Sequence, residues 1–222
     1  MKKGTIIFLS LISIIFSLIY ILLNHYGYIR FLMLHCSSIE NYIKTYKNLD
    51  KIDDNHIIII SLIIHNENAN ITPTIKSLLD QTVKVHNILL VNYNDSYTLL
   101  PSLKKIIATY RISTDNGILN SIISPIKQHG DANIKIITLD TSKIYGVDFI
   151  ETIIENSIKA PNKIVYINNK TDFIKLENGV LFPITLFKPD FFNIPTDITS
   201  NQYINQYFKS TPKIHLTYNN NI

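Results

Sequence analysis

The sequence predicts an α/β domain of three layers with a mainly parallel sheet, preceded by one N-terminal transmembrane helix. From His56 onwards, stretches of Ile, Leu and Val alternate with stretches whose apolar residues recur at helical spacing. Such alternation is typical of βαβ units, whose crossovers make neighbouring strands parallel. Acidic and amide residues follow several strand-like stretches, and open α/β sheets bind their ligands at that position. The stretch from Ile6 to Leu23 is uncharged and apolar.

The amino terminus carries the membrane signal. About 18 or more apolar residues suffice to cross a bilayer as a helix, whereas the apolar region of a cleaved signal peptide is shorter, ~7–15 residues. Residues 24–36 show no small-residue cleavage pattern, so we favour an uncleaved signal anchor. Lys2 and Lys3 precede the span and Arg30 follows it, which weakly favours a cytoplasmic amino terminus. We therefore expect a single-pass type II membrane protein of the secretory pathway, with its domain lumenal or extracellular.

Four parts are expected along the chain. Residues 1–5 form a cytoplasmic tail, 6–23 the signal anchor, 24–55 a stem and 56–222 the α/β domain. The single cysteine, Cys36, lies in the stem, which excludes an internal disulfide and a zinc site of four cysteines. Cys36 is either a free thiol or a link to another chain, so a homodimer or a hetero-complex through the stem stays open.

The composition excludes several classes of function. Apolar residues make up 46% of the 222 residues, enough for a packed core, and the lysines behind the net charge of +4 are scattered, so no nucleic-acid partner is expected. The seven histidines lack zinc-ligand spacing, and the six glycines form no phosphate-binding loop. Asn70, Asn94 and Asn169 begin N-glycosylation sequons, typical of a glycoprotein, although chance explains most sequons in a chain so rich in Asn.

The elements of the domain follow from their apolar patterns. The β-branched run from Ile57 to Ile64 is typical of a strand covered on both faces, and Ile75, Leu78 and Leu79 share one face of the helix that follows. Strands are predicted at residues 57–64, 87–92, 110–113, 134–139 and 163–167. Helices are predicted at residues 71–82, 97–108, 116–128 and 147–159, with a last helix that buries Tyr203, Tyr207 and Phe208.

Polar residues follow the predicted strands where a ligand crevice would lie. Because the carboxyl ends of parallel strands meet at one edge of the sheet, we expect these side chains to converge there. Each of them also has a plain structural interpretation, since Asp, Asn and Ser after a strand often cap the next helix. The candidates are His65, Asn66, Glu67, Asn94, Asp95, Asp115 and Asp140.

Four segments, in order, resemble family 2-like glycosyltransferases of the GT-A fold. The run "IIIISLIIHNENANITPTIKSLLDQTVKVHNILLVNYNDS" resembles the opening of that fold, and Ser77 to Thr82 fits its helical cadence Ser-Leu-Leu-x-Gln-Thr closely. The segment "TDNGILNS" resembles an Asp-x-Gly-x-x-x-Lys segment, "IITLDTSKIYGVDF" the strand with Asp-x-Asp and the next helix, and "ENGVLFPITLFKPDFFN" a segment near the acceptor site. The resemblance runs from about His56 to Tyr218.

The resemblance implies a nucleotide-diphospho-sugar transferase with a divalent ion, Mn or Mg, held at Asp140. It implies that Asn66, Glu67, Asp95 and Asp115 bind the nucleotide-sugar donor. In this family the ion bridges the donor diphosphate and the Asp-x-Asp carboxylates. A separate carboxylate deprotonates the acceptor hydroxyl in inverting members.

The chain departs from the family where the chemistry lies. Ser142 replaces the second carboxylate of Asp-x-Asp, and a neutral hydroxyl is a poor substitute for a carboxylate ligand. Ser121 stands in place of a Lys, and Gly146 follows Tyr145 where the family has Pro. The family's acidic pair falls near Thr199 and Ser200, which leaves Asp197 as the weak candidate for the base.

Two functions follow from this pattern. The first is a membrane-anchored glycosyltransferase that transfers a sugar from a nucleotide-sugar donor to a glycan or protein acceptor. The second is an inactive pseudo-glycosyltransferase without a cofactor, acting as a membrane-tethered binding or scaffold module. A third reading, an unrelated lumenal α/β domain, rests on the strand and helix pattern alone.

Overall fold

A computed structural model describes residues 3–25, 27–51, 55–64, 70–92, 99–111, 117–129, 133–167, 173–195 and 197–218. The helices are α1 (Lys3–His25), α2 (Tyr28–Cys36), α3 (Ile39–Lys47), α4 (Thr72–Leu79), α5 (Asn120–His129), α6 (Phe149–Lys159) and α7 (Ser200–Tyr207). The strands are β1 (Ile57–Ile63), β2 (Asn87–Asn92), β3 (Ile107–Arg111), β4 (Ile134–Asp140), β5 (Ile164–Ile167), β6 (Val180–Pro183) and β7 (Lys213–Leu216).

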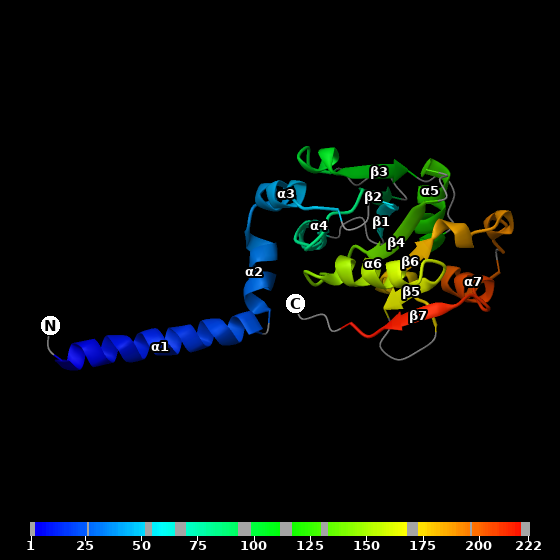
Figure 1. Cartoon of the computed structure of the whole chain (residues 1–222). Helices are drawn as coiled ribbons and strands as arrows, with labels where there is room; N and C mark the ends of the chain where they lie inside the picture. The colour runs from blue at the N-terminus through cyan, green and yellow to red at the C-terminus, as the bar shows by residue number, and fades with distance from the viewer. Residues whose placement is uncertain are drawn as a thin grey trace.

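The described strands form a sheet of seven in the order β3-β2-β1-β4-β6-β5-β7. Only β6 is antiparallel to its neighbours, so the prediction of a mainly parallel sheet is confirmed. In the register, Ile63 at the end of β1 lies opposite Val91 of β2 and Asp140 of β4. The carboxyl ends of β1, β2 and β4 therefore meet at one edge of the sheet (Figure 1).

Helices cover both faces of the sheet, which gives the three layers that the sequence predicts. On one face, α3, α4 and α6 pack against β1, β2 and β4 in the larger hydrophobic cluster. On the other face, α5 and α7 pack against β5 and β6. Strand β4 is buried along its whole length, as expected of a strand covered on both sides.

The predicted helix over residues 97–108 is wrong in its described part. Residues 103–105 form one 3-10 turn, η1 (Leu103–Lys105), and β3 begins at Ile107, three residues before the predicted strand. Ile107 pairs with Ile88 of β2 and is buried. Pairing with a neighbouring strand thus overrides the helical preference of the local sequence.

Strands β6 and β7 are absent from the sequence-based assignment. Each has only four residues, too few to show a period, and β6 ends at a proline. Val180 and Leu181 of β6 are fully buried between β4 and β5. These two strands extend the sheet beyond the βαβ units that the sequence pattern shows.

Part of the predicted stem packs on the domain. Ile39, Ile43 and Tyr46 of α3 are buried and belong to the larger hydrophobic cluster. The Tyr46 hydroxyl also accepts a hydrogen bond from the Val85 amide at 3.2 Å. Helix α3 is therefore part of the hydrophobic core in this structure.

Helix α1 projects away from the domain and meets α2 at a sharp bend (Figure 1). Among the residues whose side chains are described, no single helix is both long and apolar enough to cross a membrane. Ser10–His25 and Tyr28–Cys36 reach the required length and hydropathy only as a pair, and they are bent by 77°. The structure does not confirm the span over residues 6–23, which stays a prediction.

Candidate functional site

The described site lies where β4 ends. Asp140 is its last residue, and its side chain is 9% exposed. Its carboxylate oxygen Oδ1 accepts a hydrogen bond from the Ser142 amide at 2.8 Å. The turn that follows the strand thus holds the carboxylate, which remains at the edge of the sheet predicted for ligand binding.

The Tyr145 hydroxyl contacts the backbone of Asp140. It accepts a hydrogen bond from the Asp140 amide at 2.8 Å and donates to the Asp140 carbonyl at 2.9 Å. Burial raises the pKa of the Tyr145 hydroxyl far above its usual value, so the group stays protonated and can do both. Tyr145 therefore fixes the backbone of Asp140.

Ser77 of α4 and Gln81, two residues after the end of α4, hold the same loop. Ser77 Oγ accepts a hydrogen bond from the Tyr145 amide at 3.1 Å. Gln81 donates to the Gly146 carbonyl at 2.7 Å and accepts from the Ile150 amide at 3.0 Å. Ser77 and Gln81 of the Ser-Leu-Leu-x-Gln-Thr cadence are buried, and they connect the α4 region to the loop that precedes α6.

Lys143 links the Asp140 turn to the segment before β6. Its Nζ donates to the Glu177 carbonyl at 2.9 Å and to Asn178 Oδ1 at 2.7 Å. Burial lowers the pKa of Lys143, while the carboxylates of Asp140 and Glu177 act in the opposite direction. Asn201 of α7 donates to Glu177 Oε2 at 3.2 Å, so α7 joins the same polar cluster.

Gly146 lies against the side chain of Tyr218, in the segment that follows β7. A Cβ at this position would overlap the hydroxyl of Tyr218, and that hydroxyl donates a hydrogen bond to the Asp148 carboxylate. Phe149 packs edge-on against the Tyr218 ring at 5.2 Å between centroids. The residue that replaces the family's proline is therefore one that leaves room for Tyr218.

No protein-family model and no curated protein matches the sequence. Among solved structures, the mannosyltransferase PcManGT from Pyrobaculum calidifontis, solved with GDP-Man and Mn2+, is similar with a TM-score of 0.52 at 9% identity, over 84% of this chain and 64% of that one. TarS 1–349 from S. aureus, solved with UDP, gives 0.55 at 11% identity, over 73% and 58%. The 4-diphosphocytidyl-2C-methyl-D-erythritol synthase from Anaerococcus prevotii gives 0.54 at 13% identity, over 76% and 89%.

The chain has a divergent GT-A-like fold. The fold predicted from the ordered segments is thereby confirmed, and it is shared by sugar transferases and cytidylyltransferases. At identities of 9–13% the likeness concerns the fold alone. The chain spans less of the mannosyltransferase and TarS chains, 64% and 58%, than of the synthase, 89%.

The described residues of this GT-A-like domain do not by themselves form a metal site. Over the ranges that the structure describes, no three His, Cys, Asp or Glu side chains gather where they could hold an ion. Asp140 accepts a hydrogen bond from the Ser142 amide, and the electrostatic attraction between Asp140 and Lys143 opposes the lowered pKa of that lysine. A neighbouring ammonium group weakens the attraction of a lone carboxylate for a divalent cation.

All four predicted donor-binding residues, Asn66, Glu67, Asp95 and Asp115, fall outside the described residues and stay predictions. The same holds for His65 and Asn94, which are also candidates for the crevice edge. Asp197 is exposed and precedes α7, whose amino end is closed by a capping box between Thr199 and Gln202. Thr199 is the N-cap of α7, and Ser200 is its first residue. Ser121 is buried and donates to the Ile118 carbonyl at 2.8 Å.

The sequence reasoning missed Lys143, Glu177 and Asn201. Lys143 lies three residues after Asp140, but Glu177 and Asn201 come from later segments with no shared motif. Gln81 could have been found from the sequence, because it belongs to the Ser-Leu-Leu-x-Gln-Thr cadence of the family. The structure assigns Gln81 a supporting role behind the site.

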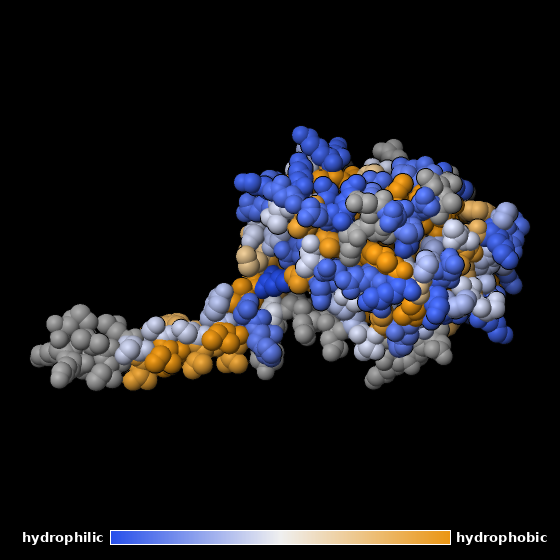
Figure 2. All heavy atoms as spheres, in the orientation of Figure 1, coloured by the Kyte–Doolittle hydropathy of each residue, from blue (hydrophilic) through white to orange (hydrophobic). Residues whose placement is uncertain are grey.

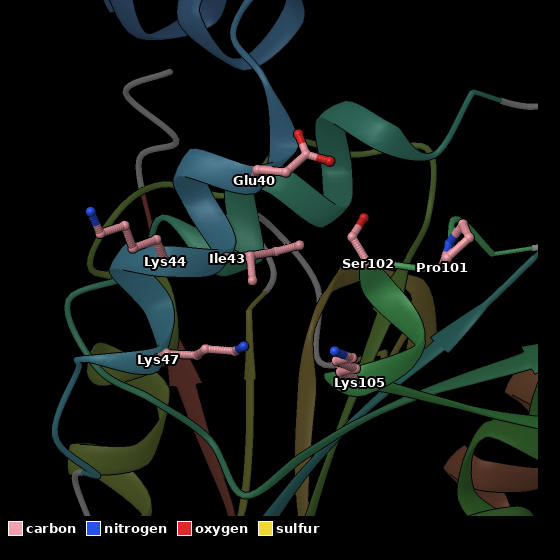
Figure 3. Close-up of a pocket in the computed structure, with 7 residues that line it drawn as sticks. All are labelled: Glu40, Ile43, Lys44, Lys47, Pro101, Ser102 and Lys105. Carbon is pink, nitrogen blue, oxygen red and sulfur yellow. The ribbon is translucent and has the colours of Figure 1, made fainter.

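A groove bordered by charged side chains lies elsewhere on the domain, between α3 and η1 (Figure 3). It is an open groove of about 440 Å³ lined by Glu40, Ile43, Lys44, Lys47, Pro101, Ser102 and Lys105. Lys47 and Lys105 extend into it from opposite sides, whereas Lys44 points away (Figure 3). Since η1 precedes β3, the groove lies toward the edge where the parallel strands begin, away from Asp140.

Proposed function

We propose that the domain binds a nucleotide-sugar at the carboxyl edge of β1, β2 and β4 and transfers the sugar to a glycan or protein acceptor. One observation carries the proposal. Asp140 is held at the end of β4, at the ligand-binding edge of a sheet whose fold is shared with proteins solved with GDP-Man or UDP.

The Asp140 turn is the proposed contact for the phosphate and ribose part of the donor. Its carboxylate can accept hydrogen bonds from ribose hydroxyls, and Lys143 brings a positive charge toward the same place. We further propose that Asn66, Glu67, Asp95 and Asp115 contact the nucleoside, as the resemblance implies. Asp197 remains the candidate base for the acceptor hydroxyl, because it is exposed at the start of α7.

The effect of a divalent ion on nucleotide binding is to be measured. Mn2+ accompanies GDP-Man in the mannosyltransferase structure. Such an ion, when bound, neutralises charge on a leaving diphosphate. In this chain Asp140 would be its ligand, but the described residues add no cluster of carboxylates, so we assign no step to the ion.

The membrane part of the proposal rests on the sequence. Residues 6–23 would span the bilayer once, with the amino terminus cytoplasmic and the domain lumenal or extracellular. Protease treatment of sealed membrane vesicles that contain the full chain tests this orientation. A domain digested without detergent contradicts it.

Nucleotide binding is tested by thermal and chemical unfolding of the full chain in detergent, with UDP, GDP, CDP or CTP, each with and without Mn2+. A ligand at 100 times its dissociation constant should stabilise the domain by about 2.7 kcal/mol. The variant Asp140→Asn should lose this stabilisation. The control Glu155→Gln should keep it, because Glu155 is an exposed carboxylate on α6 whose partner is Lys159 at 3.9 Å. Absence of a shift with every nucleotide refutes the proposal.

The alternative, an inactive binding module, rests on Ser142, which stands in place of the second carboxylate of Asp-x-Asp. One experimental result distinguishes the binding module from the enzyme. A nucleotide that binds at Asp140 without release of nucleoside diphosphate from any nucleotide-sugar tested with candidate acceptors would favour the module. A preference for CTP over the diphosphates would instead point to nucleotidyl transfer.

A further inference from the structure

Helix α2 distributes its residues the opposite way from an ordinary surface helix. Its only arginine, Arg30, faces the domain, where Nε donates to Asp80 Oδ2 at 2.9 Å, and only 17% of that side chain is exposed. Leu34 is fully buried on the same side. Tyr28 and Leu32 point outward and are 58% and 57% exposed.

The outward face of α2 is broad and carries no Lys, Arg, Asp or Glu, and its one side chain that can become positively charged is the exposed His35, whose ring lies against that of Phe31 at 4.2 Å between centroids. We define it by Tyr28, Phe31, Leu32 and Met33, of which Phe31 and Met33 are 39% and 54% exposed. A helix that faces water normally places its charged residues outward and its apolar residues inward. An apolar face of this kind on a helix docked to a domain is characteristic of a surface that another apolar phase covers.

The continuity of α2 with α1 indicates which phase covers this face. Gly27, in a left-handed conformation with φ of 71°, separates the two helices. Between Leu11 and Leu23, all the large apolar side chains of α1 except the half-buried Ile12 are 41–68% exposed, and they extend around the helix. Figure 2 shows apolar surface along the projecting α1 and at its junction with α2.

The angle between the helices fits a membrane surface. If α1 runs along the bilayer normal, a helix bent from it by 77° lies close to the membrane plane. In Figure 1, α2 stands between α1 and the domain and runs across the direction of α1. This is the place of an interfacial helix, whose apolar face lies in the boundary between headgroups and acyl chains.

We propose that the outward face of α2 lies in the interface of the same bilayer that α1 crosses. The proposal rests on the membrane span proposed above. The Arg30–Asp80 ion pair connects α2 to the end of α4, and Ser77 of α4 and the following Gln81 hold the loop after Asp140. Contact of α2 with lipid would therefore fix the orientation of the candidate site relative to the membrane.

The chain contains no tryptophan, so a single introduced Trp reports its surroundings without background. The full chain is reconstituted in phosphatidylcholine vesicles that contain lipids brominated near the glycerol end of the acyl chains. Leu32→Trp and, separately, Met33→Trp should lose roughly half of their emission, because an interfacial helix lies roughly 5–10 Å into this region. Both positions are more than half exposed, so the larger ring requires no repacking.

Two controls separate this proposal from the span. Phe192→Trp lies on the domain at a position 40% exposed and should keep its emission. Phe16→Trp in α1 should be quenched by bromines deeper in the chains if α1 crosses the bilayer. Quenching of Phe16→Trp with none at positions 32 and 33 overturns the proposal for α2 and leaves the span intact.

Two further outcomes overturn the proposal. If neither Phe16→Trp nor the α2 variants are quenched, both the span and the interfacial helix are wrong. If the emission of Leu32→Trp is shifted to the blue independently of lipid and changes with protein concentration, a second copy of the chain covers the face instead.

Discussion

The Asp140 loop and the groove between α3 and η1 are two regions of one domain, built in opposite ways. Around Asp140, side chains from α4, the loop itself and the segment before β6 are buried and joined by hydrogen bonds. In the groove, Lys47 and Lys105 are exposed on an open surface. The groove has more positive charge, but the polar side chains around Asp140 are fixed by hydrogen bonds, and fixed side chains are what a binding site needs.

The largest effect is expected from Gln81→Leu. This change removes the hydrogen-bond partners of the buried Ile150 amide and of the Gly146 carbonyl. Leaving two such groups unpaired should lower the free energy of unfolding by about 3 kcal/mol, measured by urea denaturation. The control Gln128→Leu, at an exposed position of α5, should change it by less than about 0.5 kcal/mol. Equal effects would show that the loop is not held from α4.

A smaller loss is expected from Tyr145→Phe. It preserves the buried ring but removes the hydroxyl that contacts both the amide and the carbonyl of Asp140. We expect about 2 kcal/mol of destabilisation and weaker nucleotide binding, because the Asp140 backbone is no longer fixed. The control Tyr28→Phe removes an exposed hydroxyl on α2 and should leave both quantities unchanged. A stable Tyr145→Phe protein would contradict the role assigned to this hydroxyl.

The pH dependence of Lys143 gives a subtler test of the same loop. Burial lowers its pKa in the folded protein below the usual value of 10.5. Between these two pKa values the unfolded chain binds more protons, so stability should rise with pH as Lys143 loses its charge. Lys143→Met should abolish this rise, measured as the change in urea midpoint between about pH 7 and 10. Identical pH profiles for parent and variant would show that burial does not disfavour the charged lysine.

The smallest effect is expected in the groove. Lys105→Gln removes an exposed charge that extends into it from η1 (Figure 3). Surface changes of this kind usually alter stability by less than about 0.5 kcal/mol, and nucleotide binding at Asp140 should not change. If Lys105→Gln abolishes nucleotide stabilisation while Asp140→Asn does not, the ligand site is the groove and not the Asp140 loop.

Tyr46 anchors α3, the helix that forms one wall of the groove, to the hydrophobic core. Burial raises the pKa of Tyr46 to about 12. This group therefore contributes stability below pH 10 that is lost as the pH rises toward 12. The wall of the groove is held by the core beneath it, even though the groove itself is solvated.

The strands that could be predicted are those with long apolar runs. Strand β2 begins and ends at the predicted residues, and β1 and β4 differ by one residue at their ends. The failures lie at Ile107 and Val180, where short segments become strands because a neighbour pairs with them. The site divides in the same way: Asp140 follows a strand and could be predicted, whereas Glu177 and Asn201 reach it from distant segments.

By itself, the sequence determined the alternation of strands and helices, the mainly parallel sheet and the position of Asp140 at its carboxyl edge. Those features depend on local periodicity and on where apolar runs end. Only the tertiary structure decided that Ser77 and Gln81 hold the Asp140 loop, that Gly146 leaves room for the Tyr218 hydroxyl, and that α2 turns its apolar face outward. Those features depend on which buried polar atoms find partners and on which surfaces remain uncovered, and both follow from segments that meet only when the chain is folded.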